Sequence, residues 1–84
     1  MDPVALDSAL LASAAHDPGR HLLDVEFRTG ERYRFFNVPS VCYRELLCAD
    51  SKGRYFNSNI RNRFPYQHLS RTPSPVVLPL AKTK

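Results

Sequence analysis

Hydrophobic and polar residues alternate along two neighbouring segments, residues 21–28 and 32–36, and this period of two predicts two β-strands. A Thr-Gly pair lies between them, so we expect the strands to form a hairpin. A two-residue loop would place Phe27 on the same face as Arg32, whereas a three-residue loop separates apolar from charged side chains. With the three-residue loop, the apolar face holds Leu23, Val25, Phe27, Tyr33 and Phe35, and the charged face holds Asp24, Glu26, Arg28, Arg32 and Arg34. The sequence therefore predicts the three-residue loop.

A segment of small and apolar residues over positions 8–16 precedes the hairpin. The Asp17-Pro18-Gly19 sequence that follows it is a strong turn signal. A helix over residues 6–15 is also compatible with its Ala and Leu content, because both are good helix formers. The position of the turn favours a strand.

Two helices are predicted after the hairpin. Pro39 and Ser40 suit the first turn of a helix over residues 41–49. At about 100° per residue, Cys42, Tyr43, Leu46 and Leu47 share one face of this helix, and Arg44, Glu45 and Cys48 lie on the other. The next helix is expected over residues 52–63, with Ser51 as its N-terminal cap and an apolar stripe of Phe56, Ile60 and Phe64.

These elements predict an α+β domain, a three-stranded antiparallel sheet followed by two helices packed on one face. Its core is expected to include Phe27, Tyr33, Phe35, Phe56 and Ile60. Residues 1–7 lack a sustained pattern and are expected to be flexible. Residues 71–84 hold three prolines within seven positions and are expected to form a flexible Pro-rich tail. Alternatively, the apolar residues 76–78 add to a sheet edge or dock on a partner.

The length of 84 residues allows a single small domain with little room for an enclosed substrate cavity, which argues against an enzyme. Neither the three His nor the two Cys residues have the spacing of metal ligands, and no catalytic residue or cofactor is predicted. No apolar run is long enough for a membrane span, and acidic residues precede the Leu/Ala stretch near the N-terminus. We therefore expect a cytoplasmic protein with no membrane contact; its oligomeric state stays open.

Charge is distributed unevenly along the chain. Residues 1–26 hold five acidic residues against one arginine, whereas residues 27–84 hold eleven lysine and arginine residues against three acidic ones. The basic part predicts a polyanionic partner, although basic character in small domains also serves solubility alone.

The basic residues gather around the second predicted helix. The candidate nucleic-acid-binding residues are Lys52, Arg54, Asn57, Ser58, Arg61 and Arg63. Arginine suits phosphate geometry, and an Asn amide both donates to phosphate and accepts from a base or sugar. Tyr55 and Tyr66 are candidates for stacking on bases. In the alternative interpretation, Asn57 and Ser58 bond to nearby backbone and have a structural role.

Several short motifs make the sequence similar to a known family. They are Val25-Glu26-Phe27 followed by Gly30, Tyr33-Arg34-Phe35, Val38-Pro39, Tyr43, Ala49-Asp50-Ser51-Lys52-Gly53, and Tyr55-Phe56-Asn57 followed by Ile60-Arg61. In these positions the chain resembles the KTSC domain, a module found at the carboxyl end of some lysyl-tRNA synthetases and as a stand-alone bacterial protein. The chain departs from the family pattern at Phe35 and His16, where the family has or often has Tyr. The resemblance implies a KTSC-like domain over residues 8–70 and, by association with a synthetase, RNA binding.

Two functions of different kinds follow. The first is a non-enzymatic module that binds RNA, tRNA-like or otherwise structured, through the basic helix face. The second is a protein-protein interaction module whose tail or sheet edge engages a partner. The affinity of the first should depend strongly on salt, and that of the second only weakly.

Overall fold

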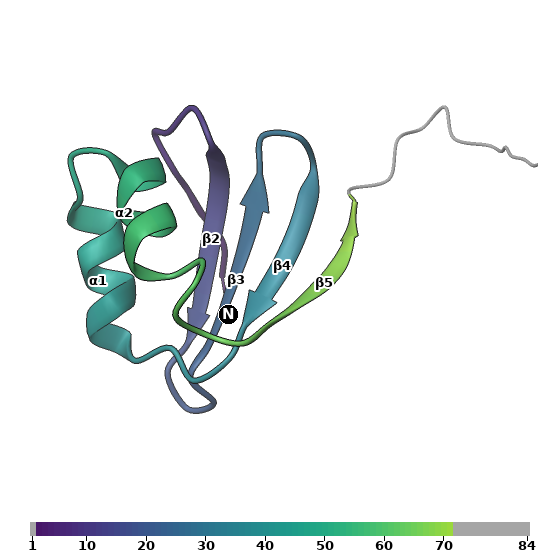
Figure 1. The fold of residues 1–84 in the computed structure, drawn as a ribbon, viewed down its shortest axis with the longest axis vertical. Coiled ribbons are helices and arrows are strands. Elements are labelled where there is room, and N and C mark those ends of the chain that lie inside the picture. The colour runs from purple at the N-terminus through teal and green to yellow at the C-terminus, as the bar shows by residue number, and fades with distance from the viewer. Residues whose placement is uncertain (1, 72–84) are drawn as a thin grey trace, which may run out of the picture.

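The computed structural model describes residues 2–71 and folds them into one sheet and two helices (Figure 1). The elements are β1 (Val4–Ala5), β2 (Leu11–Asp17), β3 (Leu22–Phe27), β4 (Glu31–Phe35), α1 (Ser40–Cys48), α2 (Lys52–Asn59) and β5 (Tyr66–Arg71). The strands are antiparallel, and their order in the sheet is their order in the chain, from β1 to β5. The α+β class with two helices against a sheet is confirmed.

The hairpin of β3 and β4 has the predicted register. Asp24 pairs with Arg34, and Val25 pairs with Tyr33, so odd positions face odd positions across a three-residue loop. Gly30 closes this loop with a φ of 96°, and its backbone N–H donates to the Phe27 carbonyl over 2.9 Å. A positive φ at the third loop residue is the usual geometry of such hairpins.

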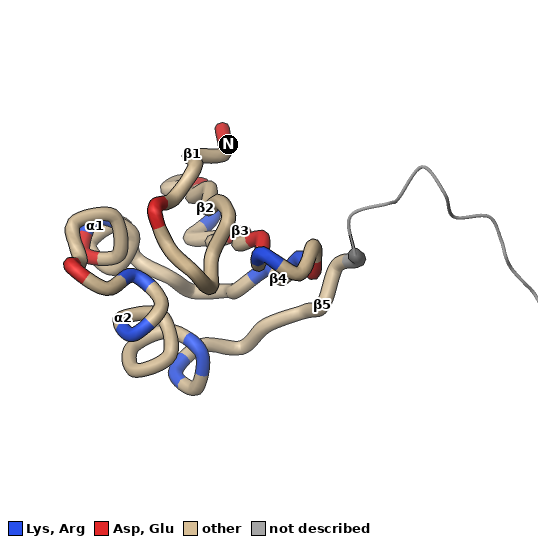
Figure 2. Tube along the Cα trace, turned by 90° about the horizontal axis from the view of Figure 1, so that it is seen from above, with Lys and Arg blue, Asp and Glu red and all other residues tan. Residues whose placement is uncertain are grey.

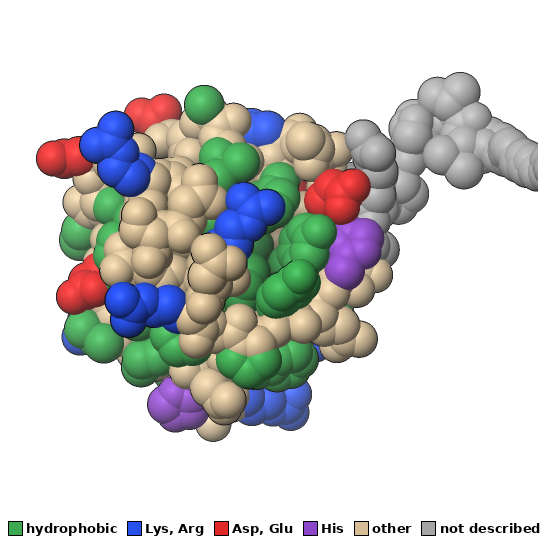
Figure 3. Space-filling view, viewed as in Figure 1, with side chains coloured by type: hydrophobic (Ala, Val, Ile, Leu, Met, Phe, Trp, Pro, Cys, Tyr) green, Lys and Arg blue, Asp and Glu red, His purple; other side chains and the backbone are tan. Residues whose placement is uncertain are grey.

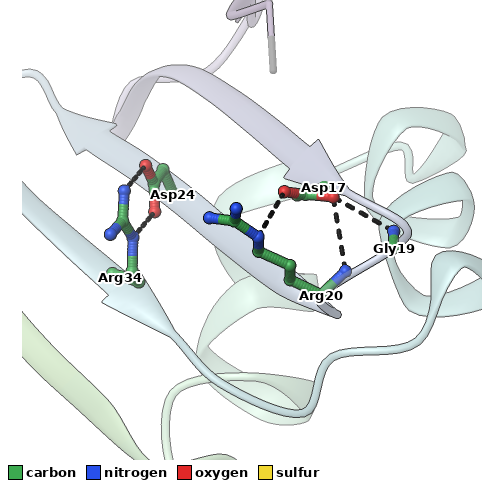
Figure 4. Close-up of polar contacts among 5 residues, drawn as sticks. All are labelled: Asp17, Gly19, Arg20, Asp24 and Arg34. Carbon is green, nitrogen blue, oxygen red and sulfur yellow. Dashed lines mark hydrogen bonds and ion pairs between the residues drawn. The ribbon is translucent and has the colours of Figure 1, made fainter.

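The segment before the hairpin is a strand, as the position of the turn predicted. β2 ends at Asp17, whose Oδ1 atom accepts hydrogen bonds from the backbone N–H groups of Gly19 (3.0 Å) and Arg20 (3.3 Å) (Figure 4). The side chain of Asp17 therefore stabilises the turn that separates β2 from β3.

The predicted number of three strands is wrong, because the described residues form five. β1 lies within the segment expected to be flexible, yet it pairs with β2, and Leu6 directly after it is buried. β5 pairs with β4 from Phe35↔Tyr66 to Glu31↔Arg71. A strand of two residues carries no detectable alternation, and β5 has polar residues on both faces, so neither has the pattern that identifies a half-buried strand.

The C-terminal tail predicted over residues 71–84 lies outside the described residues except for Arg71, the last residue of β5. The interpretation of residues 76–78 as an edge strand lies outside them as well.

The two helices lie where the sequence predicts them. In α1 Leu46 is buried, whereas Arg44, Glu45 and Cys48 are exposed, as the helical period requires. The Oγ atom of Ser51 caps α2 by accepting from the Arg54 N–H.

The second helix is shorter than the predicted range of 52–63. The Phe56 carbonyl accepts from the N–H groups of both Ile60 and Arg61, and the chain leaves the helix there. Asn59 and Asn62 are weak helix formers, and the residue before Pro65 disfavours helical geometry, so the last predicted turn becomes a separate turn.

The core lies between the helices and the β2–β4 part of the sheet. Its most buried large side chains are Phe56, Leu11, Leu23, Leu46, Ile60 and Val38. Of the five predicted core residues, Phe35, Phe56 and Ile60 are buried, and Phe27 and Tyr33 are partly buried against them. Viewed from above, the helices lie to one side, and β4 and β5 extend away from them (Figure 2).

Candidate binding surface

The predicted site residues surround α2 and the turn after it. Arg54, Asn57 and Ser58 are exposed on the helix, and Lys52 at its start is half-buried. Arg61 and Arg63 are exposed on the turn that follows α2. Basic residues therefore extend from the start of α2 to the turn that leads toward β5 (Figure 2).

Four of the six predicted residues, Lys52, Arg54, Asn57 and Ser58, line one open hollow of about 610 Å³, which we call the α2 hollow. Its other wall consists of residues 7–10. At Gly53 a Cβ atom would lie 3.3 Å from the Leu10 Cβ, so the lack of a side chain there lets the first turn of α2 approach that wall closely.

The charges of the α2 hollow are mixed. Asp7 and Asp50 line it together with the two cations. The Nζ atom of Lys52 also donates to the Ala49 carbonyl over 3.1 Å, so part of its hydrogen-bonding capacity is used within the domain. The α2 hollow alone is therefore not a strongly positive surface.

Asn57 and Arg61 are joined by a side-chain hydrogen bond, because the Arg61 Nη1 atom donates to the Asn57 Oδ1 atom over 3.1 Å. The Asn57 amide oxygen therefore accepts from a side chain, whereas the alternative interpretation expects a bond to nearby backbone. The bond connects the α2 hollow with the turn beyond the helix.

Tyr55 of α2 contacts α1. Its hydroxyl donates to the Glu45 Oε1 atom over 2.6 Å, and its ring packs partly buried against the core. Burial, and then the hydrogen bond to Glu45, raise the pKa of the Tyr55 hydroxyl above its usual range. The predicted stacking role of Tyr55 thus competes with a structural one.

Tyr66, the second predicted stacking residue, lies in a different hollow, which the sequence did not predict. This aromatic hollow of about 100 Å³ is lined by Phe27, Tyr33, Phe35, Phe56, Arg61, Asn62 and Tyr66. The sequence indicated Tyr66 as a stacking residue but not its neighbours, because Tyr33 and Tyr66 come together only through the pairing of β4 with β5.

The arginines on the outer face of the hairpin are largely engaged within the domain. Arg34 forms a two-pronged ion pair with Asp24, with N···O distances of 2.8 and 2.9 Å (Figure 4), and this bond and charge raise the pKa of Arg34. The Arg28 guanidinium donates to the carbonyls of Ser8 and Leu6, both over 2.9 Å. These two cations therefore stabilise the fold.

Among residues 2–69, no group of three or more His, Cys, Asp or Glu side chains has the arrangement of a metal site. Cys42 and Cys48 are free thiols. No helix of the described region has the length and apolar character needed to cross a membrane.

The comparisons with known proteins agree on one family. The model of the KTSC domain matches residues 7–64. A protein of Stutzerimonas stutzeri is 47% identical over 57 residues, which cover 68% of this chain and 80% of that protein. A crystal structure of a KTSC domain protein from Yersinia pestis superposes with a TM-score of 0.79 at 26% identity, covering 82% of this chain and 97% of that one.

A longer relative contains a similar segment. The lysine–tRNA ligase of a Nostoc species is 34% identical over 64 residues, which cover 76% of this chain but only 11% of the ligase.

Proposed function

This chain belongs to the KTSC domain family, and from that premise we propose that it is a small binding module whose ligand is RNA. The proposed contacts are made by the basic residues of α2 and of the turn after it. The proposal is one of binding, and it assigns no catalytic residue and no cofactor.

The relatives support an RNA ligand. A segment like this domain forms about a tenth of a lysine–tRNA ligase, and the name of that enzyme states that it acts on a tRNA. Because the matched part is so small, the ligase reaction itself does not transfer to this chain. A tRNA-like or otherwise structured RNA is the ligand that we propose.

The observation that carries the proposal is the position of Arg61. Its guanidinium is bonded to Asn57 on the α2 side and lines the aromatic hollow on the other side. One cation therefore lies between polar groups that suit phosphate and rings that suit bases. Proteins that bind single-stranded nucleic acids combine these two features.

The test is a titration of the full chain with total cellular RNA at two salt concentrations. The variant Arg54→Gln/Arg61→Gln removes two exposed cations, and Gln is nearly as good a helix former as Arg. We expect weaker binding to all RNA sequences alike. The slope of log K against log salt should decrease by about 1.4–1.8, at about 0.7–0.9 per lost phosphate contact.

The matched control is Arg20→Gln/Arg44→Gln, which removes the same charge from exposed side chains outside both hollows. Its affinity should stay close to that of the wild type. Equal losses in both double variants would mean that only net charge matters, and an unchanged Arg54/Arg61 variant would place the contacts elsewhere. If that variant unfolds in a thermal melt, the two arginines are structural and the proposal is wrong.

The second candidate function is binding of a protein strand at β5. This strand is the last in the sheet order, so its outer edge pairs with no other strand of the described residues. An open edge accepts an added strand through backbone hydrogen bonds. Binding of that kind would depend little on salt, and this separates it from RNA binding in the same titration.

A further inference from the structure

We propose that the aromatic hollow is a stacking site for an unpaired base of single-stranded RNA. This inference rests on the proposed function and names the part of the ligand that the hollow would take.

Rings from three neighbouring strands lie next to one another. Phe27 of β3 lies 5.4 Å from Tyr33 of β4, and Tyr33 lies 5.6 Å from Tyr66 of β5, measured between ring centroids. His68 on β5 adds a fourth ring, 4.7 Å from Tyr33. Aromatic side chains on adjacent strands of a sheet are the platform on which other small RNA-binding domains stack two or three bases.

The outermost ring is open to solvent, and the rings beneath it are buried. Tyr66 is 57% exposed, whereas Phe35 and Phe56 in the floor of the hollow are 2% and 0% exposed. Phe56 meets Phe35 edge-on, with an interplanar angle of 85°. A well-packed floor under an exposed ring keeps the platform in place without a ligand, which lowers the entropy cost of binding.

The aromatic hollow lies beside the end of α2, between Phe56 of that helix and the turn residues Arg61 and Asn62. The helix ends at Asn59, and the chain then runs along the side of the sheet to β5, where the Phe36 N–H donates to the Pro65 carbonyl over 2.9 Å. Figure 3 shows hydrophobic side chains gathered over β4 and β5, with a basic side chain between them and the helices. The residues that line the aromatic hollow therefore come from β3, β4, β5, α2 and the turn after α2.

The charges around the hollow favour an anionic ligand. Arg61 and Asn62 line its rim, and among the described residues that line it none is acidic. Glu31 does not line the hollow, and its Oε1 atom lies 2.9 Å from the Nε2 atom of His68. Arg61 can meet a phosphate, and the Asn62 amide can donate to or accept from a base edge.

The size of the hollow fits one flat ring lying on its surface. Its volume of about 100 Å³ is below the roughly 150 Å³ of an apolar cavity that encloses benzene. The hollow therefore cannot enclose a base, but a base can stack on the exposed ring of Tyr66 with one face in water. Stacking is tolerant of sequence because every base has a π-face.

The experiment compares a single-stranded RNA of about ten nucleotides, within the length that one small domain covers, with an RNA duplex of the same length. The variant Tyr66→Leu keeps an apolar side chain but loses the aromatic face, and Tyr66→Phe keeps that face. We expect Tyr66→Leu to weaken binding of the single strand by at least about fivefold, the lower end of one lost base stack. Tyr66→Phe should bind like the wild type, and the duplex should bind all three proteins alike.

The salt slope separates this site from the basic surface. Tyr66→Leu should leave the slope unchanged because no phosphate contact is lost. In the wild type, the ring protons of Tyr66 should move upfield in NMR spectra when the single strand binds. This measurement uses only the wild type, so it tests the proposal even if Tyr66→Leu does not fold.

Each outcome distinguishes the two proposals. If Tyr66→Leu binds the single strand as Tyr66→Phe does and the ring protons do not move, stacking is refuted even if the Arg54/Arg61 variant weakens binding. If Tyr66→Leu weakens binding and the arginine variant does not, stacking stands and the helix-face contacts are refuted. A wild type that binds no RNA refutes both.

Discussion

Gly30 determines the register of the central hairpin at the scale of a single residue. Its φ of 96° is a conformation that residues with a Cβ atom rarely adopt, and it brings Tyr33 opposite Val25 on the helix-facing side. A shift of one residue would move every ring of β4 to the opposite face of the sheet. The core and the aromatic hollow therefore both depend on this loop.

Replacing Gly30 with Ala should destabilise the protein by about 1–2 kcal/mol, the cost of a Cβ atom at positive φ. For a domain of this size, a loss of 1 kcal/mol lowers the Tm by about 4–8 °C in a thermal melt. Gly19→Ala is the matched control, because its Cβ would make only an ordinary contact of 3.5 Å with Asp17. Equal Tm changes in the two variants would contradict the role assigned to the Gly30 backbone.

Several polar side chains that could contact a ligand are used inside the fold instead. Arg28 bonds to two backbone carbonyls, Arg34 to Asp24 and Tyr55 to Glu45. His16, at one position where the chain departs from the family pattern, contacts the Val38 carbonyl through its Nε2 atom (2.7 Å) and stacks on Tyr43. A polar side chain that the sequence pattern places on the surface is therefore not always available for binding a ligand.

At the scale of elements, the bond from Tyr55 to Glu45 joins α2 to α1. The ring of Tyr55 packs on the core from α2, while Glu45 lies on the exposed face of α1. The position of α2 relative to α1 determines where its basic residues lie, so this bond also orients the proposed RNA-binding surface.

The raised pKa of Tyr55 predicts a loss of stability in alkaline solution. The folded protein keeps the phenol proton above its ordinary pKa of 10.0, whereas the unfolded chain loses it there. The contribution of Tyr55 to the free energy of unfolding is therefore complete below about pH 10, and it decreases as the pH rises toward the pKa of the folded state. In thermal melts at about pH 8 and pH 11, Tyr55→Phe should show a smaller decrease of Tm than the wild type.

The burial of Tyr43 raises the pKa of its hydroxyl in the same direction, so Tyr55→Phe should retain part of the alkaline decrease. Tyr66→Phe is the control, since it removes one phenol from an exposed side chain. A Tyr55→Phe protein with the full alkaline decrease would show that burial and the Glu45 bond do not hold the proton on Tyr55.

At the scale of the whole molecule, one aromatic side chain joins both layers. Phe56 of α2 is fully buried and meets Phe27 and Phe35 of the sheet edge-on, at centroid distances of 5.5 and 5.4 Å. It also forms the floor of the aromatic hollow. Stability and the shape of the proposed site thus depend on the same residue.

Truncation of Phe56 to Ala should cost about 3–5 kcal/mol, a large share of the total for a domain of this size. Phe35→Ala should have a similar effect, because that side chain is equally enclosed. Urea unfolding measures both, with Val41→Ala on the exposed side of α1 as the control that should change stability by less than about 0.5 kcal/mol. A mild effect of Phe56→Ala would contradict a shared core between sheet and helices.

The sequence alone determined the features that depend on near neighbours in the chain. Alternation and the Thr-Gly turn identified the hairpin and its register, the helical period identified the buried face of α1, and Ser51 was recognised as a cap. These signals are local, because strand alternation, helical period and capping each involve residues within a few positions of one another.

The tertiary structure decided what depends on residues far apart in the sequence. β5 joins the sheet only by pairing with β4 about thirty-five residues earlier, and β1 has too few residues to carry a pattern. The six predicted site residues could be recognised as exposed on or near α2. That four of them line the α2 hollow, Arg61 lines the aromatic hollow and Arg63 lines neither could not be predicted, because Tyr33 and Tyr66 come to line one hollow only when β5 pairs with β4. Cross-strand neighbours come from register between distant segments, which no local pattern encodes.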